Sequence, residues 1–129
     1  FGEDLTGSSF AFWGLSFKPE TDDMREAPSI VIANELIQRG AKITAYDPVA
    51  IDEAKIILGN KIAYSDNAYS ALQDADALLL ITEWREFRSP DWSKVKSELK
   101  NPILFDGRNI YDSSDLKSKG FTYYGIGTK

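Results

Sequence analysis

The 129-residue sequence contains neither cysteine nor histidine. The lack of cysteine excludes a disulfide scaffold and a thiolate nucleophile. Together the two absences exclude a histidine general base and a Cys/His zinc site. Within this chain, only carboxylates, lysine, tyrosine, serine and threonine remain for acid–base or nucleophilic chemistry. The composition therefore leaves this chain with few groups suited to catalysis.

Long hydrophobic runs and an excess of positive charge are also missing. No apolar run approaches the roughly 18 to 20 residues that cross a bilayer, and no signal peptide is visible. Fifteen Lys and Arg against twenty Asp and Glu give a net charge of −5, which argues against nucleic-acid and anionic-membrane partners. We expect a cytoplasmic protein of one domain. Because the first residue is Phe1 and not Met, we also expect it to be a piece of a longer protein.

Apolar strands alternate with helical segments along the whole chain. Strands are expected at 9–15, 42–46, 61–64, 77–82, 103–105 and 122–126. Helices are expected to begin near Pro28, Ile51, Ser65, Asp91 and Asp112. Such alternation is typical of a parallel sheet covered on both faces, and right-handed crossovers limit the strand order. We predict a single Rossmann-like α/β domain over residues 1–129, with three layers and about six mostly parallel strands in the order 3-2-1-4-5-6.

In such a sheet, ligands bind beyond the carboxyl ends of the strands where the strand order reverses. Here these are the loops at 16–27, 83–90 and 106–111, which contain Lys18 and four of the five arginines, namely Arg25, Arg85, Arg88 and Arg108. Arginine suits a bidentate grip on phosphate or carboxylate, so this edge is a candidate anion site. The same loops also carry many acidic residues, which could simply pair with the arginines. This pattern alone leaves both interpretations open.

For three further features we favour a structural explanation over a functional one, and for a fourth, Trp84, two interpretations stay open. The first turn, Gly14 to Pro19, lacks the G-x-G-x-x-G pattern and begins a long loop, which disfavours a free-standing NAD site. We interpret Asp47-Pro48 as a turn and not as a ribose-binding acid. The acidic pair Asp22-Asp23 is expected to cap a helix or form salt bridges, not to bind a cation. Trp84 either packs at the sheet edge or belongs to an interface.

Four motifs resemble one known family. The segment GLSFKPETDDMREAP at 14–28 is similar to the G-L-x-F-K-P-x-T-D-D-x-R-E-[AS]-P signature of the UDP-glucose/GDP-mannose dehydrogenase family, where it opens the C-terminal domain. YDP at 46–48, TEWREF at 82–87 and FDGRN at 105–109 follow in the family's order, and the TEWREF form points to the UDP-glucose branch. The resemblance extends over essentially the whole chain and covers about the last third of the family's full-length enzyme.

The resemblance implies a function in which this chain is one part. Such enzymes oxidise UDP-glucose to UDP-glucuronate with NAD, which the N-terminal domain mainly binds, while the catalytic cysteine lies in the middle of the enzyme. The present chain would be the UDP-binding C-terminal domain, inert alone. By matching motif positions, Phe17 and Lys18 would contact the nucleotide-sugar, Arg108 would contact substrate across a dimer interface, and Arg25 would reach toward NAD. The implied partners are the missing N-terminal and central domains and a second copy of the enzyme, as a homodimer or higher oligomer. Arg85 and Arg88 receive no role.

Two alternatives from other classes stay open at this point. A signalling receiver-like domain would need a phosphoacceptor aspartate after its third strand and a lysine after its fifth, where this chain offers Asp66 and Arg108. A stand-alone nucleotide-binding module is the other alternative. A preceding G-x-G-x-x-G domain and a cysteine-containing motif would favour the dehydrogenase.

Overall fold

One six-stranded parallel sheet forms the centre of the molecule. The computed structural model describes residues 5–16, 28–108 and 110–125. Its strands are β1 (Ser9–Trp13), β2 (Lys42–Tyr46), β3 (Ala63–Tyr64), β4 (Ala77–Leu80), β5 (Ile103–Asp106) and β6 (Thr122–Gly125). Their order is β3-β2-β1-β4-β5-β6, as predicted, and every neighbouring pair is parallel.

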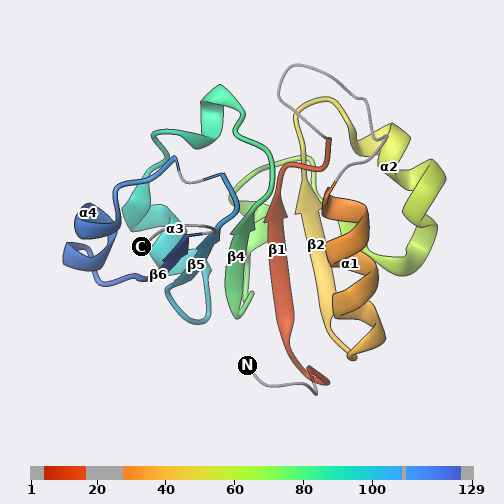
Figure 1. Ribbon diagram of the computed structural model, residues 1–129, viewed down its shortest axis with the longest axis horizontal. Helices are drawn as coiled ribbons and strands as arrows, with labels where there is room; N and C mark the ends of the chain where they lie inside the picture. The colour runs from red at the N-terminus through yellow and green to blue at the C-terminus, as the bar shows by residue number, and fades with distance from the viewer. Residues whose placement is uncertain (1–4, 17–27, 109, 126–129) are drawn as a thin grey trace.

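Helices cover the sheet on both faces (Figure 1). Helices α1 (Pro28–Gln38) and α2 (Ile51–Leu58) follow β1 and β2, and α1 lies on the face turned toward the viewer, which we call the α1 face. Helices α3 (Trp92–Glu98) and α4 (Ser113–Ser118) follow β4 and β5 on the opposite side, which we call the α3 face. This arrangement confirms the three-layer, Rossmann-like α/β fold.

Alternation along the strands divides the core into two clusters, one on each face. Phe10 and Phe12 point to the α1 face and pack with Ile43 and Ala33. The intervening Ala11 and Trp13 point to the α3 face, where they pack with the cluster that contains Val95 of α3. Since successive side chains of a strand point to opposite faces, the near-continuous apolar run of β1 is explained by burial on both sides.

Local hydrogen bonds in the structure explain the predicted starts of α3 and α4. The Asp91 carboxylate accepts a hydrogen bond from Lys94 N at the start of α3. The Asp112 carboxylate accepts hydrogen bonds from Ser114 N and Asp115 N at the start of α4. These are N-terminal caps, which satisfy amide groups that the first helical turn leaves without partners.

The segment between β3 and β4 differs from the prediction. Instead of a helix from Ser65 to about Ala75, it forms turns and one short 3₁₀ helix, η2 (Ser70–Leu72). The Asn67 side chain accepts hydrogen bonds from Tyr69 N and Ser70 N, and Asp74 has a positive φ of 59°. Side-chain bonds to nearby amides and a left-handed residue both oppose a continuous helix. The expectation of a helix after every strand is therefore wrong at this connection.

Smaller differences concern strand ends. β1 ends at Trp13 and β4 at Leu80, each two residues earlier than predicted, and β3 is shorter because Gly59–Lys61 forms the 3₁₀ helix η1. A further 3₁₀ helix, η3 (Arg85–Phe87), was not predicted. Among the described helices, none combines the length and apolarity that a bilayer crossing requires.

Candidate functional site

Three chain segments meet closely at the carboxyl edge of the sheet, where the strand order reverses between β1 and β4. Gly14, just after β1, has φ +98°, and a Cβ there would lie 2.4 Å from the Cβ of Thr82. Gly107, just after β5, would place a Cβ 2.8 Å from the Leu80 carbonyl oxygen, to which its own amide donates. Glycine at both positions therefore serves the chain's own packing. At Gly107 the close approach is to β4.

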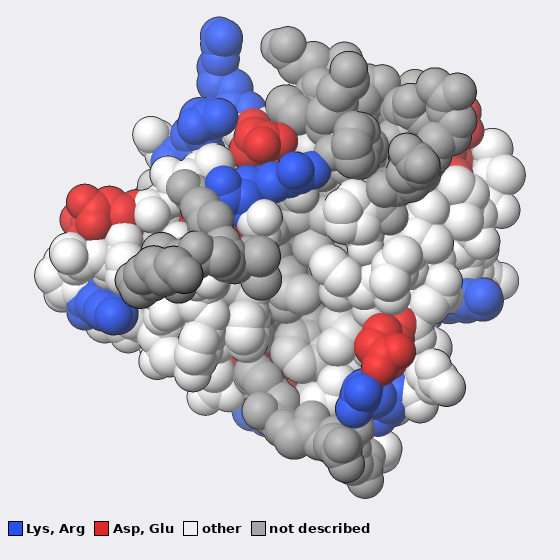
Figure 2. Space-filling view, viewed as in Figure 1, with Lys and Arg blue, Asp and Glu red and all other residues white. Residues whose placement is uncertain are grey.

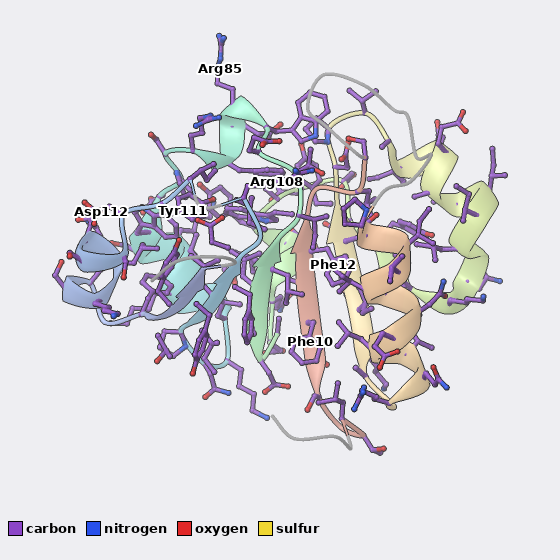
Figure 3. All side chains as sticks on the ribbon, viewed as in Figure 1. Phe10, Phe12, Arg85, Arg108, Tyr111 and Asp112 are labelled. Carbon is purple, nitrogen blue, oxygen red and sulfur yellow. The ribbon has the colours of Figure 1, made fainter. Side chains whose placement is uncertain are left out.

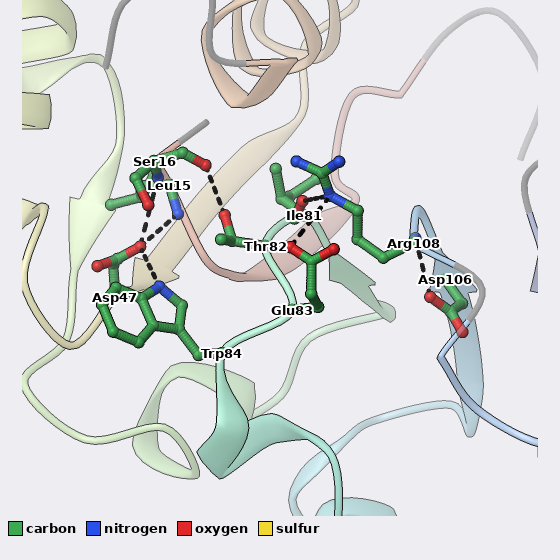
Figure 4. Close-up of polar contacts among 9 residues, drawn as sticks. All are labelled: Leu15, Ser16, Asp47, Ile81, Thr82, Glu83, Trp84, Asp106 and Arg108. Carbon is green, nitrogen blue, oxygen red and sulfur yellow. Dashed lines mark hydrogen bonds and ion pairs between the residues drawn. The ribbon is translucent and has the colours of Figure 1, made fainter. Parts of the chain in front are cut away.

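Asp47 ties the turn after β1 to the end of β2 (Figure 4). Its Oδ2 accepts hydrogen bonds from Leu15 N at 2.8 Å, Ser16 N at 3.4 Å and Trp84 Nε1 at 3.2 Å. Its Oδ1 accepts from the amides of Val49 and Ala50 at 2.9 and 2.8 Å. The carboxylate is 2% exposed and its oxygens are used by the protein, which confirms the interpretation as a turn. Trp84, 8% exposed, is a packing residue here.

Two hydroxyl groups hold the same turn from other sides. Thr82 Oγ1 donates to the Ser16 carbonyl at 2.7 Å, and Ser29 Oγ of α1 donates to the Leu15 carbonyl at 2.5 Å. All four residues are fully buried. The backbone at 15–16 is therefore fixed by β2, β4 and α1 together, immediately before the predicted substrate-contacting residues at 17 and 18.

Arg108 is the predicted site residue whose position the structure describes. Its Nε donates to the Ile81 carbonyl at 2.9 Å and lies 3.8 Å from a Glu83 carboxylate oxygen. The side chain is 26% exposed, so part of it reaches solvent at the edge. Figures 3 and 4 show that the Arg108 side chain extends from the loop after β5 to a position above the ends of β1 and β4, where the strand order reverses. A partly neutralised arginine here is suited to hold an anion by charge-assisted bonds.

The loop that carries Arg108 is fixed by Asp106, which is fully buried. Its Oδ1 accepts from Arg108 N at 3.0 Å, and its Oδ2 accepts from Tyr111 N at 3.0 Å and the Tyr123 hydroxyl at 2.8 Å. Burial, with Asp106 beside the ring hydroxyls, raises the pKa values of Tyr111 and Tyr123 well above the usual range. Both phenols are therefore neutral donors at physiological pH, and the Tyr111 hydroxyl donates to the Phe87 carbonyl.

The remaining arginines of this edge stand apart from Arg108. Arg85 and Arg88 are exposed on and after η3, and neither forms an ion pair with any residue that the structure describes. Figure 3 shows Arg85 extending away from the sheet, and Figure 2 shows basic side chains gathered along this edge beside acidic ones. Nearby, the Tyr46 hydroxyl donates to Glu86 at 3.2 Å, and burial and this carboxylate raise the pKa of Tyr46 to about 12.

Phe17, Lys18 and Arg25 lie outside the described residues, as do Asp22 and Asp23. Their predicted roles are therefore not tested by the structure. Residues 82, 29 and 106, which the sequence analysis did not select, turn out to build the site. The sequence did contain one indication for Asp106: it is an aspartate at the end of a strand, as Asp47 is directly after β2. Both carboxylates accept hydrogen bonds from backbone amides at the same edge of the sheet.

The receiver-like alternative does not agree with the sheet. Receiver-type and flavodoxin-like domains have the strand order 2-1-3-4-5, whereas β1 here lies between β2 and β4. Among residues 5–16, 28–108 and 110–125, no group of three or more acidic side chains is placed to hold a metal ion. Fold and edge together define a Rossmann-like α/β domain with an arginine at the point of strand reversal, a candidate anion site.

Comparison with known proteins gives the family. The family model described as "UDP-glucose/GDP-mannose dehydrogenase family, UDP binding domain" matches residues 11–113. The chain belongs to this family, as its UDP-binding domain.

Relatives and solved structures agree with this assignment. A UDP-glucose 6-dehydrogenase of Pseudomonas aeruginosa is 42% identical over 126 residues, covering 94% of this chain and 28% of that protein. One from Rhizobium meliloti is 44% identical, covering 98% of this chain and 29% of that protein. The structure of a UDP-glucose dehydrogenase from Pyrobaculum islandicum superimposes with a TM-score of 0.80 at 27% identity, covering 97% of this chain and 26% of that one. The chain thus spans under a third of the length of the relatives it matches.

Proposed function

We propose that residues 1–129 form the C-terminal nucleotide-sugar domain of an NAD-dependent UDP-glucose 6-dehydrogenase, which oxidises UDP-glucose to UDP-glucuronate. The observation that carries this proposal is the position of Arg108, anchored on Ile81 and partly exposed at the reversal point of the sheet. Family membership and relatives at 42–44% identity support the choice of substrate. The cytoplasmic location expected from the sequence stays a prediction.

Within this proposal the domain binds and orients the substrate, and the reaction takes place elsewhere. Lys18 and Arg108 donate charge-assisted hydrogen bonds to the UDP diphosphate or the sugar, and Phe17 packs against the uracil or sugar ring. The buried contacts of Asp47, Thr82 and Ser29 fix the backbone that leads to Phe17 and Lys18. Binding energy from this remote nucleotide holds the sugar C6 alcohol at a nucleophile that the cysteine-free chain does not supply.

The described residues do not fit NAD. A dinucleotide-binding turn needs an open glycine-rich cradle at the end of β1, and here the open side of Gly14 is filled by Thr82. NAD therefore belongs mainly to the N-terminal domain of the full-length protein in this proposal. Arg25 reaches toward the cofactor from the present domain.

Steady-state kinetics of the full-length protein test the substrate site. Lys18→Ala and Arg108→Ala should each raise the Michaelis constant for UDP-glucose by roughly 10- to 100-fold, because a hydrogen bond to a charged group contributes about 1.5–3 kcal/mol. Arg39→Ala is the matched control, because Arg39 is an exposed residue just after the C-terminal end of α1, where it pairs with Glu35 of that helix. If neither Lys18→Ala nor Arg108→Ala changes substrate kinetics, the assigned site is wrong.

Two further measurements separate the remaining assignments. Arg25→Ala should raise the Michaelis constant for NAD and leave that for UDP-glucose nearly unchanged, and an unaltered NAD constant would count against its role. The 129-residue chain alone should show no UDP-glucose-dependent reduction of NAD, since the catalytic cysteine and the main NAD domain are proposed to lie upstream. Turnover by this chain alone would refute the division of labour between the domains.

The dimer contact of Arg108 can be tested by subunit mixing. Full-length protein with Arg108→Ala is mixed with protein lacking the catalytic cysteine, each inactive or impaired alone. If Arg108 serves the active site of the neighbouring subunit, the mixed dimer contains one intact site and one doubly impaired site, and activity rises above the mean of the two parents. Activity equal to that mean at all mixing ratios contradicts a contact across the interface.

A further inference from the structure

Half of the α1 face of the sheet has no helix over it among the described residues (Figure 1). On this half, β4, β5 and β6 present four apolar side chains, which we call the β4–β6 face: Leu79, Ile103, Phe105 and Tyr124. The rings of Phe105 and Tyr124 stack at a centroid distance of 5.0 Å with 15° between their planes. They form a continuous apolar surface that crosses two strands.

Burial differs sharply between the two sides of the same strands. Leu78, Leu80 and Leu104, which point to the α3 face, are fully buried. Leu79 and Ile103, their neighbours on the other side, are only partly buried, and Tyr124 is 52% exposed. Parallel sheets occur almost only with both faces covered. Among the described residues, the α1 side of β4–β6 therefore lacks a second layer of helices.

The topology explains why none of the described helices covers this face. The connections β1→β2→β3 and β4→β5→β6 run in opposite directions across the sheet. Right-handed crossovers then place α1 and α2 on one face and α3 and α4 on the other. The α1 face over β4–β6 must consequently be covered by polypeptide from outside the βα repeat.

We propose that the β4–β6 face is the docking surface for the upstream part of the same polypeptide. The relatives are more than three times as long as this chain, so most of the full-length protein lies outside it. The described chain starts on the correct side: Leu5 is 4% exposed, belongs to the α1-face cluster with Phe10, and its amide donates to the Arg39 carbonyl. The described chain thus begins, at Leu5, on the α1 face of the sheet.

Charge supports an apolar contact of this kind. None of the four residues of the β4–β6 face is charged, whereas α1 and α2 carry exposed Glu35 and Lys55, and exposed Arg39 directly follows α1. Interface cores are depleted in charge and enriched in aromatic residues. The inference depends on the family assignment and not on the proposed substrate residues.

Thiol labelling of the full-length protein tests the docking. Two variants place a thiol on this side of β6: Tyr124→Cys and, as a smaller change, Thr122→Cys. The control is Ile56→Cys, at a position on α2 that is 77% exposed, which checks that the reagent reaches the folded domain. Labelling is followed by peptide mass spectrometry, with protein in urea as the reference. We expect the thiols introduced at positions 124 and 122 to label at least about tenfold more slowly in the native protein than in urea, as local opening governs access to a buried thiol. Native rates within about threefold of those in urea overturn the proposal.

Cross-linking identifies what covers the face. Tyr124 is replaced by the photoreactive p-benzoylphenylalanine in the full-length protein, and ordinary and ¹⁵N-labelled subunits are exchanged before illumination. We expect links from position 124 to residues upstream of Phe1 within one isotopic species. Links that join light to heavy chains would assign the face to a second copy, and links only within residues 1–129, or none, would leave no docked upstream segment; each of these results overturns the proposal.

Discussion

Replacing Asp47 with alanine should be one of the most destabilising single changes in this domain. The carboxylate is 2% exposed and accepts hydrogen bonds from five N–H groups. Four of the donors belong to Leu15, Ser16, Ala50 and Trp84, all buried, while Val49 is 52% exposed and its amide can turn to water. Each buried donor left without an acceptor costs about 1–3 kcal/mol, but donors that share one acceptor do not add independently.

We therefore expect Asp47→Ala to lower the free energy of unfolding by about 3–5 kcal/mol, a large part of the ~5–15 kcal/mol of a typical domain. Urea unfolding followed by far-ultraviolet circular dichroism measures this directly. With a slope of about 2 kcal/mol per molar urea, the midpoint should fall by roughly 2 M. Asp52→Ala, in the exposed first turn of α2, is the matched control and should change stability by less than ~1 kcal/mol. A loss below about 1 kcal/mol for Asp47→Ala would refute the role assigned to its hydrogen bonds.

Three other perturbations have outcomes that follow from the geometry. In urea unfolding, Gly14→Ala should lower the free energy of unfolding several times more than Gly7→Ala. Both glycines have a positive φ, but only at Gly14 would the new Cβ lie 2.4 Å from the Cβ of Thr82; equal losses of stability would contradict the packing argument. Thr82→Val should lower the free energy of unfolding by about 1–2 kcal/mol, because the hydrogen bond from the Thr82 hydroxyl to the Ser16 carbonyl is lost. Thr82→Ser keeps the hydroxyl and should lower the free energy of unfolding by less; equal losses for the two variants would contradict a stabilising role of this hydrogen bond. Burial and Glu86 raise the pKa of Tyr46 to about 12, so its folding contribution is complete below the unfolded pKa of about 10 and is lost as pH rises to 12. Glu86→Gln should lower that pKa in an NMR titration of the tyrosine ring carbons, and an unchanged pKa would exclude the carboxylate as a cause.

Periodicity and helix-capping residues predicted most of the fold because they act locally. Pro28, Asp91 and Asp112 each mark the start of a helix that the structure contains. Strand–helix alternation combined with crossover handedness was sufficient for the strand order. The connection after β3 was mispredicted because the capping residue Ser65 resembles a helix start, whereas the Asn67 side chain binds the following amides and stops the helix.

The site was predictable in its location but not in its construction. Strand ends and arginine placement identified the carboxyl edge and Arg108, both of which depend only on topology. The contacts of Thr82 with Ser16 and of Arg108 with Ile81 join positions 66 and 27 residues apart. Such contacts depend on side-chain packing across three strands, which no local sequence pattern encodes. The pairing interpretation is confirmed in part for Arg108, since its Nε lies 3.8 Å from a Glu83 carboxylate oxygen. The anion interpretation stays a prediction.

The most direct test of the account is a crystal structure of the full-length protein with UDP bound. The account predicts the diphosphate at the carboxyl edge of β1, β4 and β5, with Lys18 and the Arg108 guanidinium of the same or the neighbouring subunit about 2.7–3.2 Å from UDP oxygens. UDP bound away from this edge, with neither side chain in contact with it, would contradict the account.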